Sequence, residues 1–199
     1  MSPRRSAAAA LDTRRTILAR AVDVASVQGL EGLTVGTLAD DLHMSKAGVI
    51  GPFGSKEELQ LAALERAVEI FTDRVWRPAA DAEPGLPRLR ALYDARFDYL
   101  TEPVFPGGCF LAGASTEFDG RPGPVRDAIA AALDRWEAVL RAEVRVAIDA
   151  GDLPAGTDPE QLVFELEAFA VAANTALQLH RDPRGARRAR IAVERALGG

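Results

Sequence analysis

Apolar residues recur at intervals of three and four along most of the chain, which is the spacing of one face of an α-helix. The clearest stripe runs from Ile129 through Leu133, Trp136 and Leu140 to Ala147. β-branched residues stand singly and do not alternate with polar residues as they do in half-buried strands. We therefore predict an all-α protein with nine helices and no strand.

Capping and breaking residues place the ends of these helices. Gly29 ends the first helix, and Ser55 begins a capping box that starts a long one. Asp158 caps a later helix whose first residue is Pro159. Residues 2–12 are interpreted as a short frayed arm. The predicted helices cover about residues 13–28, 34–41, 45–52, 55–76, 86–100, 109–118, 124–150, 158–181 and 183–197.

Residues 34–52 have the pattern of a helix-turn-helix motif. Thr34 and Ser45 can each cap a short helix, and only the three residues 42–44 separate the two helices. The small Ala39 stands where the helices would cross. We predict a three-helix DNA-binding domain in which the helix that begins at Ser45 enters the major groove.

The distribution of charge is more informative than its total. The 199 residues carry a net charge of −5, but residues 1–58 hold seven basic and seven acidic side chains and are neutral. Both lysines, Lys46 and Lys56, lie in this segment, and Arg4 and Arg5 stand at its beginning. A relatively basic segment on an acidic chain is consistent with a region that binds nucleic acid.

Other kinds of site find little support in the sequence. Cys109 is the only cysteine, and His43 and His180 are the only histidines and lie on different predicted elements, so no zinc site is expected. No glycine-rich phosphate loop or nucleophile elbow occurs. No apolar stretch approaches the roughly 20 residues that a membrane span requires. We expect a cytoplasmic protein without metal, cofactor, membrane contact or enzymatic activity.

The string from Ser45 to Leu59, SKAGVIGPFGSKEEL, resembles the TetR family of transcriptional regulators, as does the all-helical remainder of the chain. The resemblance implies a DNA-binding domain at residues 1–55 and a ligand-binding and dimerisation domain at residues 56–199. It also implies a homodimer that binds a near-palindromic operator in double-stranded DNA. A small apolar effector molecule would then release the operator.

Three residues depart from the family pattern. The reading helix of the family commonly ends with a tyrosine and a histidine that reach phosphates, where this chain has Ile50 and Pro52. His43 stands where the family usually places a glycine in the turn. A positive φ at this position would suit glycine best, but histidine is among the better substitutes.

The DNA-binding candidates lie at the beginnings of the predicted helices, where small side chains and backbone N–H groups permit close approach to DNA. Lys46 is the leading candidate for a base contact, and Lys56 for a phosphate contact. For each candidate, plain capping or solvation is the alternative. The set comprises Thr34, Thr37, Ser45, Lys46, Ala47, Gly48, Ile50 and Lys56.

The ligand-binding candidates are aromatic and amide side chains that could converge on an apolar pocket, with ordinary core packing as the alternative. Glu117 could meet a cationic ligand or remain solvated, and Cys109 could sense oxidants or be buried and inert. The pocket candidates are Tyr93, Phe97, Phe110, Trp136, Phe169 and Asn174.

The last two predicted helices, residues 158–181 and 183–197, would form a four-helix bundle with the same helices of a second copy. The candidates for this dimer interface are Val163, Phe164, Val171, Ala189 and Val193.

Three functions remain open on these grounds. A ligand-responsive repressor would use the helix from Ser55 to Trp76 to couple effector binding to the separation of its reading helices. A helical enzyme or carrier would use the same pocket but would leave the motif from Ser45 to Glu58 unexplained. A regulator that acts through a protein partner would fit Ile50 and Pro52, and Lys46→Ala would not change its activity.

Overall fold

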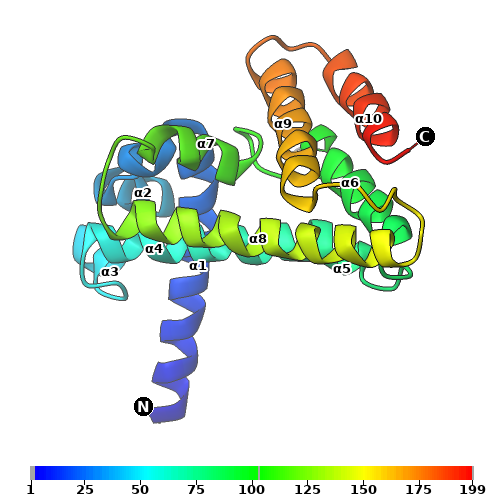
Figure 1. The fold of residues 1–199 in the computed structure, drawn as a ribbon. Coiled ribbons are helices and arrows are strands. Elements are labelled where there is room, and N and C mark those ends of the chain that lie inside the picture. The colour runs from blue at the N-terminus through cyan, green and yellow to red at the C-terminus, as the bar shows by residue number, and fades with distance from the viewer. Residues whose placement is uncertain (1–2, 103, 199) are drawn as a thin grey trace. The chain divides into compact units, whose positions relative to one another are not determined.

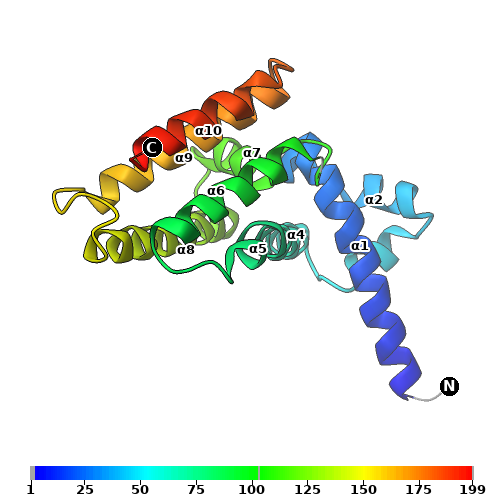
Figure 2. The same ribbon diagram turned by 90° about the vertical axis from the view of Figure 1, so that its right-hand side faces the viewer.

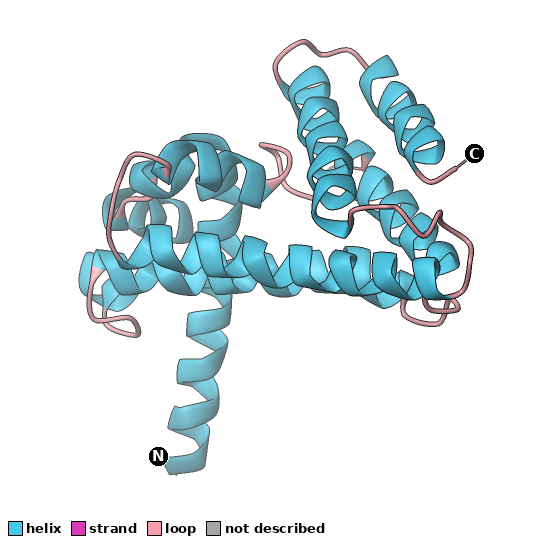
Figure 3. Cartoon of the chain, in the orientation of Figure 1, coloured by secondary structure: helices cyan, strands magenta, loops and turns pink. Residues whose placement is uncertain are grey.

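The computed structural model describes residues 3–102 and 104–198, with side chains from Ala8 onward. These residues form helices joined by loops and contain no strand (Figure 3). The elements are α1 (Pro3–Gly32), α2 (Val35–Leu42), α3 (Lys46–Ile50), α4 (Lys56–Phe71), η1 (Thr72–Trp76), α5 (Arg77–Ala79), α6 (Leu86–Thr101), α7 (Phe110–Phe118), α8 (Pro124–Asp149), α9 (Pro159–Gln178) and α10 (Arg184–Ala196).

The predicted order of helices is confirmed, and the largest difference in a boundary is at the start of the first helix. Helix α1 begins at Pro3, so the segment interpreted as an arm is helical. Its alanines have the highest helix propensity of any residue, and no breaker separates them from the apolar stripe that begins near Ile17. The side chains of Arg4 and Arg5 lie outside the described residues.

The long helix that begins after Ser55 continues beyond α4 as the π-helical turn η1 and the short helix α5. Within η1 the N–H of Arg77 donates to the carbonyl of Thr72, five residues earlier. Pro78 follows and has no N–H to offer the carbonyl of Arg74, which disfavours regular α-helical bonding at this point.

The chain folds into two compact units. Unit 1 comprises residues 1–68 and 105–129, and unit 2 comprises residues 69–104 and 130–199. Two of the three boundaries fall within α4 and α8, and the third, after residue 104, falls in the loop between α6 and α7. The sequence predicts a division of the chain at residue 55 into a DNA-binding and a ligand-binding domain. This functional division does not coincide with the boundaries of the compact units.

In unit 1, helices α2 and α7 pack against α1, and α3 packs against α2 (Figure 1). Leu38 of α2 and Val49 of α3 are fully buried, as is Ile17 of α1. The apolar stripes of the three N-terminal helices therefore form a common core that holds the helix-turn-helix motif.

In unit 2, helices α9 and α10 lie side by side, and α6 packs against both (Figure 2). A Cβ added at Gly185 would lie 2.3 Å from Cβ of Ala176, so the absence of a side chain at Gly185 permits this close approach. Tyr93, Leu140 and Leu166 are among the fully buried side chains of this unit.

Candidate functional site

The two helices of the motif are capped as the sequence predicts. Thr34 Oγ1 accepts the N–H of Thr37 at 3.0 Å, and Ser45 Oγ accepts the N–H of Gly48 at 3.0 Å. His43 ends α2 with φ 52° and ψ 42°, in the left-handed region. The positive φ considered for this position is therefore present, although a residue other than glycine adopts it.

The beginning of α3 presents small and cationic side chains on an open surface. Lys46 and Ala47 are exposed, whereas Val49 on the opposite face is buried. A Cβ added at Gly36 would lie 3.8 Å from Cε of Lys46, so the lysine stem runs beside a position of α2 that has no side chain. Among the described residues no carboxylate pairs with Lys46, which leaves its ammonium group available to DNA.

Helix α3 ends close to two of the residues that depart from the family pattern, Ile50 and Pro52. The helix ends at Ile50, which is half-buried, and Gly51 is its C-cap. Pro52 therefore lies outside the helix, where its missing N–H costs no helical hydrogen bond.

Lys56 has a different environment from the one expected of a phosphate contact. Its Nζ donates to the carbonyl of Glu31 at 2.8 Å and to Glu31 Oε1 at 3.1 Å. The hydrogen bonds from Lys56 and from Gln60 lower the pKa of the Glu31 carboxyl. Lys56 thus ties α4 to the end of α1. A phosphate contact could use only the exposed part of the Lys56 side chain.

Three of the predicted pocket residues, Tyr93, Phe97 and Trp136, are buried in unit 2. Two of them converge on a carboxylate of α9. Tyr93 Oη donates to Glu167 Oε1 at 2.9 Å, and Trp136 Nε1 donates to the same oxygen at 3.0 Å. Arg96 adds bonds from both terminal nitrogens, at 3.0 Å to Oε1 and 2.9 Å to Oε2. We call Tyr93, Arg96, Trp136 and Glu167 the Glu167 cluster.

Aromatic rings surround the cation of this cluster. The Arg96 guanidinium lies 5.6 Å from the ring centroids of both Phe71 and Trp136. Burial and the negative charge of Glu167 raise the pKa of the Tyr93 phenol well above its usual range, so Tyr93 remains a hydrogen-bond donor. The polar groups of the cluster therefore bond one another between apolar side chains in the core of unit 2.

Sequence reasoning missed Arg96 and Glu167. Arg96 directly precedes Phe97 of the α6 stripe, and Glu167 directly follows Leu166 of the α9 stripe. Opposite charges beside apolar stripes were the available signal, but periodicity does not show which helices pack together.

The other pocket candidates are placed differently. Phe110 belongs to unit 1, where it is buried at the beginning of α7. Phe169 and Asn174 are half-buried on α9. Of the predicted pocket residues, Tyr93 and Trp136 are therefore linked by hydrogen bonds to the same Glu167 carboxylate. These hydrogen bonds do not join the whole predicted set.

The predicted dimer residues divide into two groups. Val163, Ala189 and Val193 are buried within the chain's own unit 2, because they pack between its helices. Phe164 is 71% exposed and Val171 is 50% exposed. Two further apolar side chains are exposed nearby in sequence: Leu179, just beyond the end of α9, and Ile191 on α10.

The described side chains and helices offer neither a metal site nor a membrane span. No three His, Cys, Asp or Glu side chains in the described ranges are grouped closely enough to hold a metal ion. No helix there has both the length and the apolar character needed to cross a bilayer. Cys109 is buried and forms no disulfide with a described residue.

Two family models match the chain. Residues 17–63 match the bacterial regulatory proteins of the tetR family, and residues 85–193 match the tetracyclin repressor-like C-terminal domain. The first match contains the helix-turn-helix motif, and the second contains the Glu167 cluster. A comparison with curated proteins found no match.

Solved structures share the fold over nearly the whole chain. A TetR transcriptional regulator from Chloroflexus aurantiacus is 23% identical, with 95% of this chain and 96% of that chain covered and a TM-score of 0.88. A transcriptional regulator from Saccharomonospora viridis, solved in complex with choline, is 21% identical, with 94% and 96% covered and a TM-score of 0.80. A cysteine mutant of the TetR-family regulator CifR, solved with 26-bp operator DNA, is 28% identical, with 94% and 96% covered and a TM-score of 0.71.

Proposed function

Because the chain belongs to the TetR family of bacterial transcriptional regulators, we propose that it is a ligand-responsive repressor. In this proposal a homodimer binds a near-palindromic operator and releases it when a small apolar molecule binds to unit 2. The operator complex of CifR supports the DNA-binding half of the proposal, and the choline complex of the S. viridis protein supports the binding of a small molecule by this fold.

The observation that carries the proposal is the exposed beginning of α3. Ser45 uses its side chain to cap the helix, so the first turn is ordered before DNA is present. Lys46 and Ala47 project from that turn. The Lys46 ammonium pairs with no carboxylate of the described residues, and the Ala47 side chain is small enough for close approach. Lysine at the start of a recognition helix can donate to the O6 and N7 acceptors of guanine.

The exposed apolar residues of α9 and α10 support a dimer. Phe164 and Val171 lie seven residues apart, on one face of α9, and Ile191 is exposed on α10. Burying these side chains against the same face of a second copy would remove apolar surface from water. Two reading helices related by a two-fold axis would then meet half-sites roughly 34 to 36 Å apart.

The Glu167 cluster supports an effector site in unit 2. An effector lowers DNA affinity only if it binds a released conformation better than the DNA-bound one. Helix α4 contributes residues to both units, so it is the proposed route between the effector and the reading helices. An effector with a polar group and an apolar body suits the aromatic side chains around Arg96 and Glu167.

Selection on randomised duplex DNA at near-physiological salt tests the proposal. The native protein should recover a near-palindrome, and the Lys46→Ala variant should lose it. Arg195→Ala, which removes a cation from the end of α10, is the matched control and should recover the same sequence. If the native protein selects no sequence, the repressor proposal fails and the enzyme and protein-partner alternatives gain weight.

A further inference from the structure

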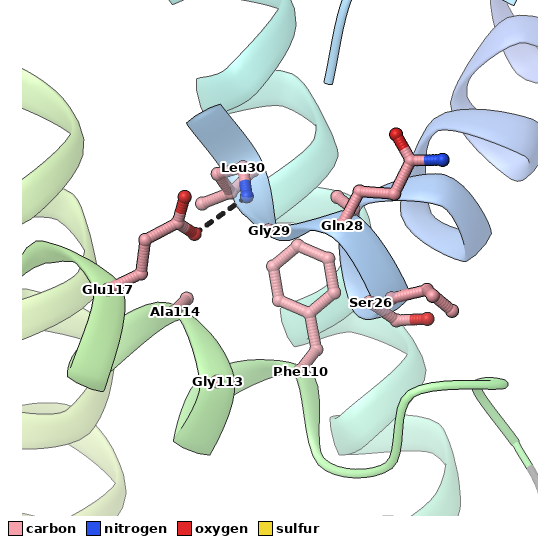
Figure 4. A pocket seen from close by; sticks show the side chains of 10 residues that line it. Ser26, Gln28, Gly29, Leu30, Phe110, Gly113, Ala114 and Glu117 are labelled. Atoms are coloured by element: carbon pink, nitrogen blue, oxygen red, sulfur yellow. Dashed lines mark hydrogen bonds between the residues drawn. The ribbon is translucent and has the colours of Figure 1, made fainter. Parts of the chain in front are cut away.

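Helix α1 is broken at Gly29, four residues before the loop that leads into α2. Gly29 has φ 79° and ψ 164°, which is outside the helical region. The N–H groups of the next two residues are bonded by one side chain from α7. Glu117 Oε2 accepts the N–H of Leu30 at 2.7 Å (Figure 4). Glu117 Oε1 accepts the N–H of Glu31 at 2.9 Å.

The carbonyls of the same two residues are bonded from α4. Gln60 Nε2 donates to the carbonyl of Leu30 at 2.7 Å, and Lys56 Nζ donates to that of Glu31. Fully buried Leu33 and the N-cap Thr34 follow immediately. Glu117 therefore helps to set the direction in which the chain enters the helix-turn-helix motif.

The approach of α7 to α1 is close at both ends. A Cβ added at Gly29 would lie 2.6 Å from Glu117 Oε1, so the carboxylate occupies the space that a side chain would need. A Cβ added at Gly107, just before α7, would lie 1.7 Å from the carbonyl oxygen of Ser26. At Gly107 the clash is with backbone, so only glycine fits there, whereas at Gly29 the positive φ of 79° favours glycine.

A pocket of about 360 Å³ lies between these two contacts, wholly within unit 1 (Figure 4). Residues 25–30 of α1 form one wall, and Phe110, Gly113, Ala114 and Glu117 form the other. Its volume is at the small end of the range for ligand pockets, about 300 to 1,000 Å³.

The Glu117 carboxylate lines this pocket without a cationic side-chain partner in the described part of the chain. The nearest arginine in sequence, Arg121, places its guanidinium 5.7 Å from the ring centroid of Phe118. A carboxylate can accept about four hydrogen bonds, and Leu30 and Glu31 supply two. Acceptor capacity and a negative charge thus remain beside the Phe110 ring.

We propose that this pocket binds a small organic cation, a primary amine with an apolar body. The ammonium group donates to Glu117, and the apolar body packs on Phe110 and the small residues Gly113 and Ala114. This site is separate from the Glu167 cluster, which belongs to unit 2.

Occupation of the pocket lowers operator affinity. The ammonium group and the N–H groups of Leu30 and Glu31 share one carboxylate, so a bound amine favours conformations in which these N–H groups are held less tightly. By linkage, operator DNA and the amine then weaken the binding of each other. This regulatory part rests on the proposed function, whereas binding of the amine does not.

Ligand-detected NMR with benzylamine tests the binding, and benzyl alcohol is the uncharged probe of similar size. Native protein should bind benzylamine and not the alcohol. Glu117→Gln should weaken benzylamine binding about tenfold or more, as expected for a hydrogen bond to a charged group. Asp119→Asn removes the same charge two residues away, outside the pocket lining, and should bind benzylamine like the native protein.

Gly113→Leu provides a second variant that leaves Glu117 intact. A Cβ at Gly113 meets no atom within 4 Å, so the leucine can fill the pocket without disturbing the backbone, and benzylamine binding should be lost. Equal binding to Gly113→Leu and native protein overturns the proposal, as does native protein that binds the alcohol as well as the amine or binds neither.

Operator affinity with and without benzylamine tests the regulation. The amine should weaken operator binding by the native protein and leave Gly113→Leu unaffected. No effect on the native protein would overturn the regulatory part. Failure to select an operator while benzylamine still binds would contradict only the proposed function, so the two failures are distinguishable.

Discussion

Individual cations of this chain differ in what they bind, although the sequence presents them alike. Each of the two lysines is the first residue of a helix, but Lys56 bonds Glu31 while Lys46 meets no carboxylate in the described residues. In α10, Arg184 bonds Asp182 and Arg190 bonds Asp94 and Asp98, so both arginines resemble Lys56 and not Lys46. The partner of each cation decides whether it can meet DNA or instead orders its own chain.

Removing the Lys46 side chain should weaken specific operator binding by about 1 to 3 kcal/mol, the discrimination that one good base contact supplies. Binding isotherms at one fixed salt concentration measure this change. Arg195→Ala should leave the dissociation constant unchanged. An unchanged constant for Lys46→Ala would show that this lysine does not read DNA.

The Asp182 carboxyl should titrate far below its ordinary pKa. Hydrogen bonds from the Arg184 side chain and backbone, with the charge of Arg184, lower the pKa of Asp182 from 3.8 to about 2. A lowered native pKa adds stability at neutral pH, and this stability is lost as the pH falls from about 4 to about 2. NMR titration should show the low midpoint in the native protein.

Substituting Arg184 separates the causes of this shift. Arg184→Ala removes the largest of them and should move the Asp182 midpoint upward toward 3.8. Arg188→Ala removes only a smaller charge effect and should move it less. Equal midpoints in all three proteins would rule out Arg184 as the cause.

At the scale of elements, caps and inter-helix bonds have separate roles. Ser45 and Thr34 satisfy N–H groups at the beginnings of their own short helices. Glu167 instead joins three helices, since its partners come from α6 and α8. Loss of a cap should therefore affect one helix, whereas loss of the Glu167 carboxylate should affect the packing of unit 2.

Ser45→Ala should destabilise the protein by about 1 kcal/mol, because the N–H of Gly48 loses its acceptor. Ser45→Asp keeps a capping oxygen and should remain close to the native stability, but its negative charge should weaken DNA binding. Urea unfolding and operator titration give the two readouts. Equal stability of Ser45→Ala and native protein would contradict the capping role.

Glu167→Ala should destabilise the protein by about 3 to 5 kcal/mol, because it leaves the guanidinium of Arg96 buried without its carboxylate. The side chains of Arg96 and Glu167 are only 8% and 16% exposed, so water compensates little. Glu137→Ala is a control, since its pair with Arg141 is more exposed and should contribute less. Chemical denaturation measures both, and a small loss for Glu167→Ala would show that the cluster relaxes readily.

At the scale of the whole molecule, the apolar face of α9 is the feature that one chain does not cover. Phe164→Asp should shift the protein from dimer to monomer, because it places a charge at the centre of the proposed interface. Sedimentation at several protein concentrations measures the shift. Glu165→Gln, a neighbouring change away from the exposed apolar set, should leave the dimer intact, and a native monomer would exclude the interface.

Much of the architecture followed from the sequence by itself. The order of the helices and the caps Thr34 and Ser45 depend on residues within a few positions of each other, whereas the left-handed conformation of His43 came from the structure. Helical periodicity and capping are short-range effects, so a sequence pattern determines them directly. The start of α1 was the exception, because the alanine-rich segment has helix propensity but no apolar stripe.

Only the tertiary structure decided which side chains meet. Lys56 bonds Glu31, and Tyr93 and Trp136 both bond Glu167. Val163 is buried by side chains of its own unit. Glu117 finds the N–H groups of Leu30 and Glu31, which precede it by more than 80 residues. These contacts depend on how helices distant in sequence pack together, and periodicity specifies a buried face without specifying the helix that covers it.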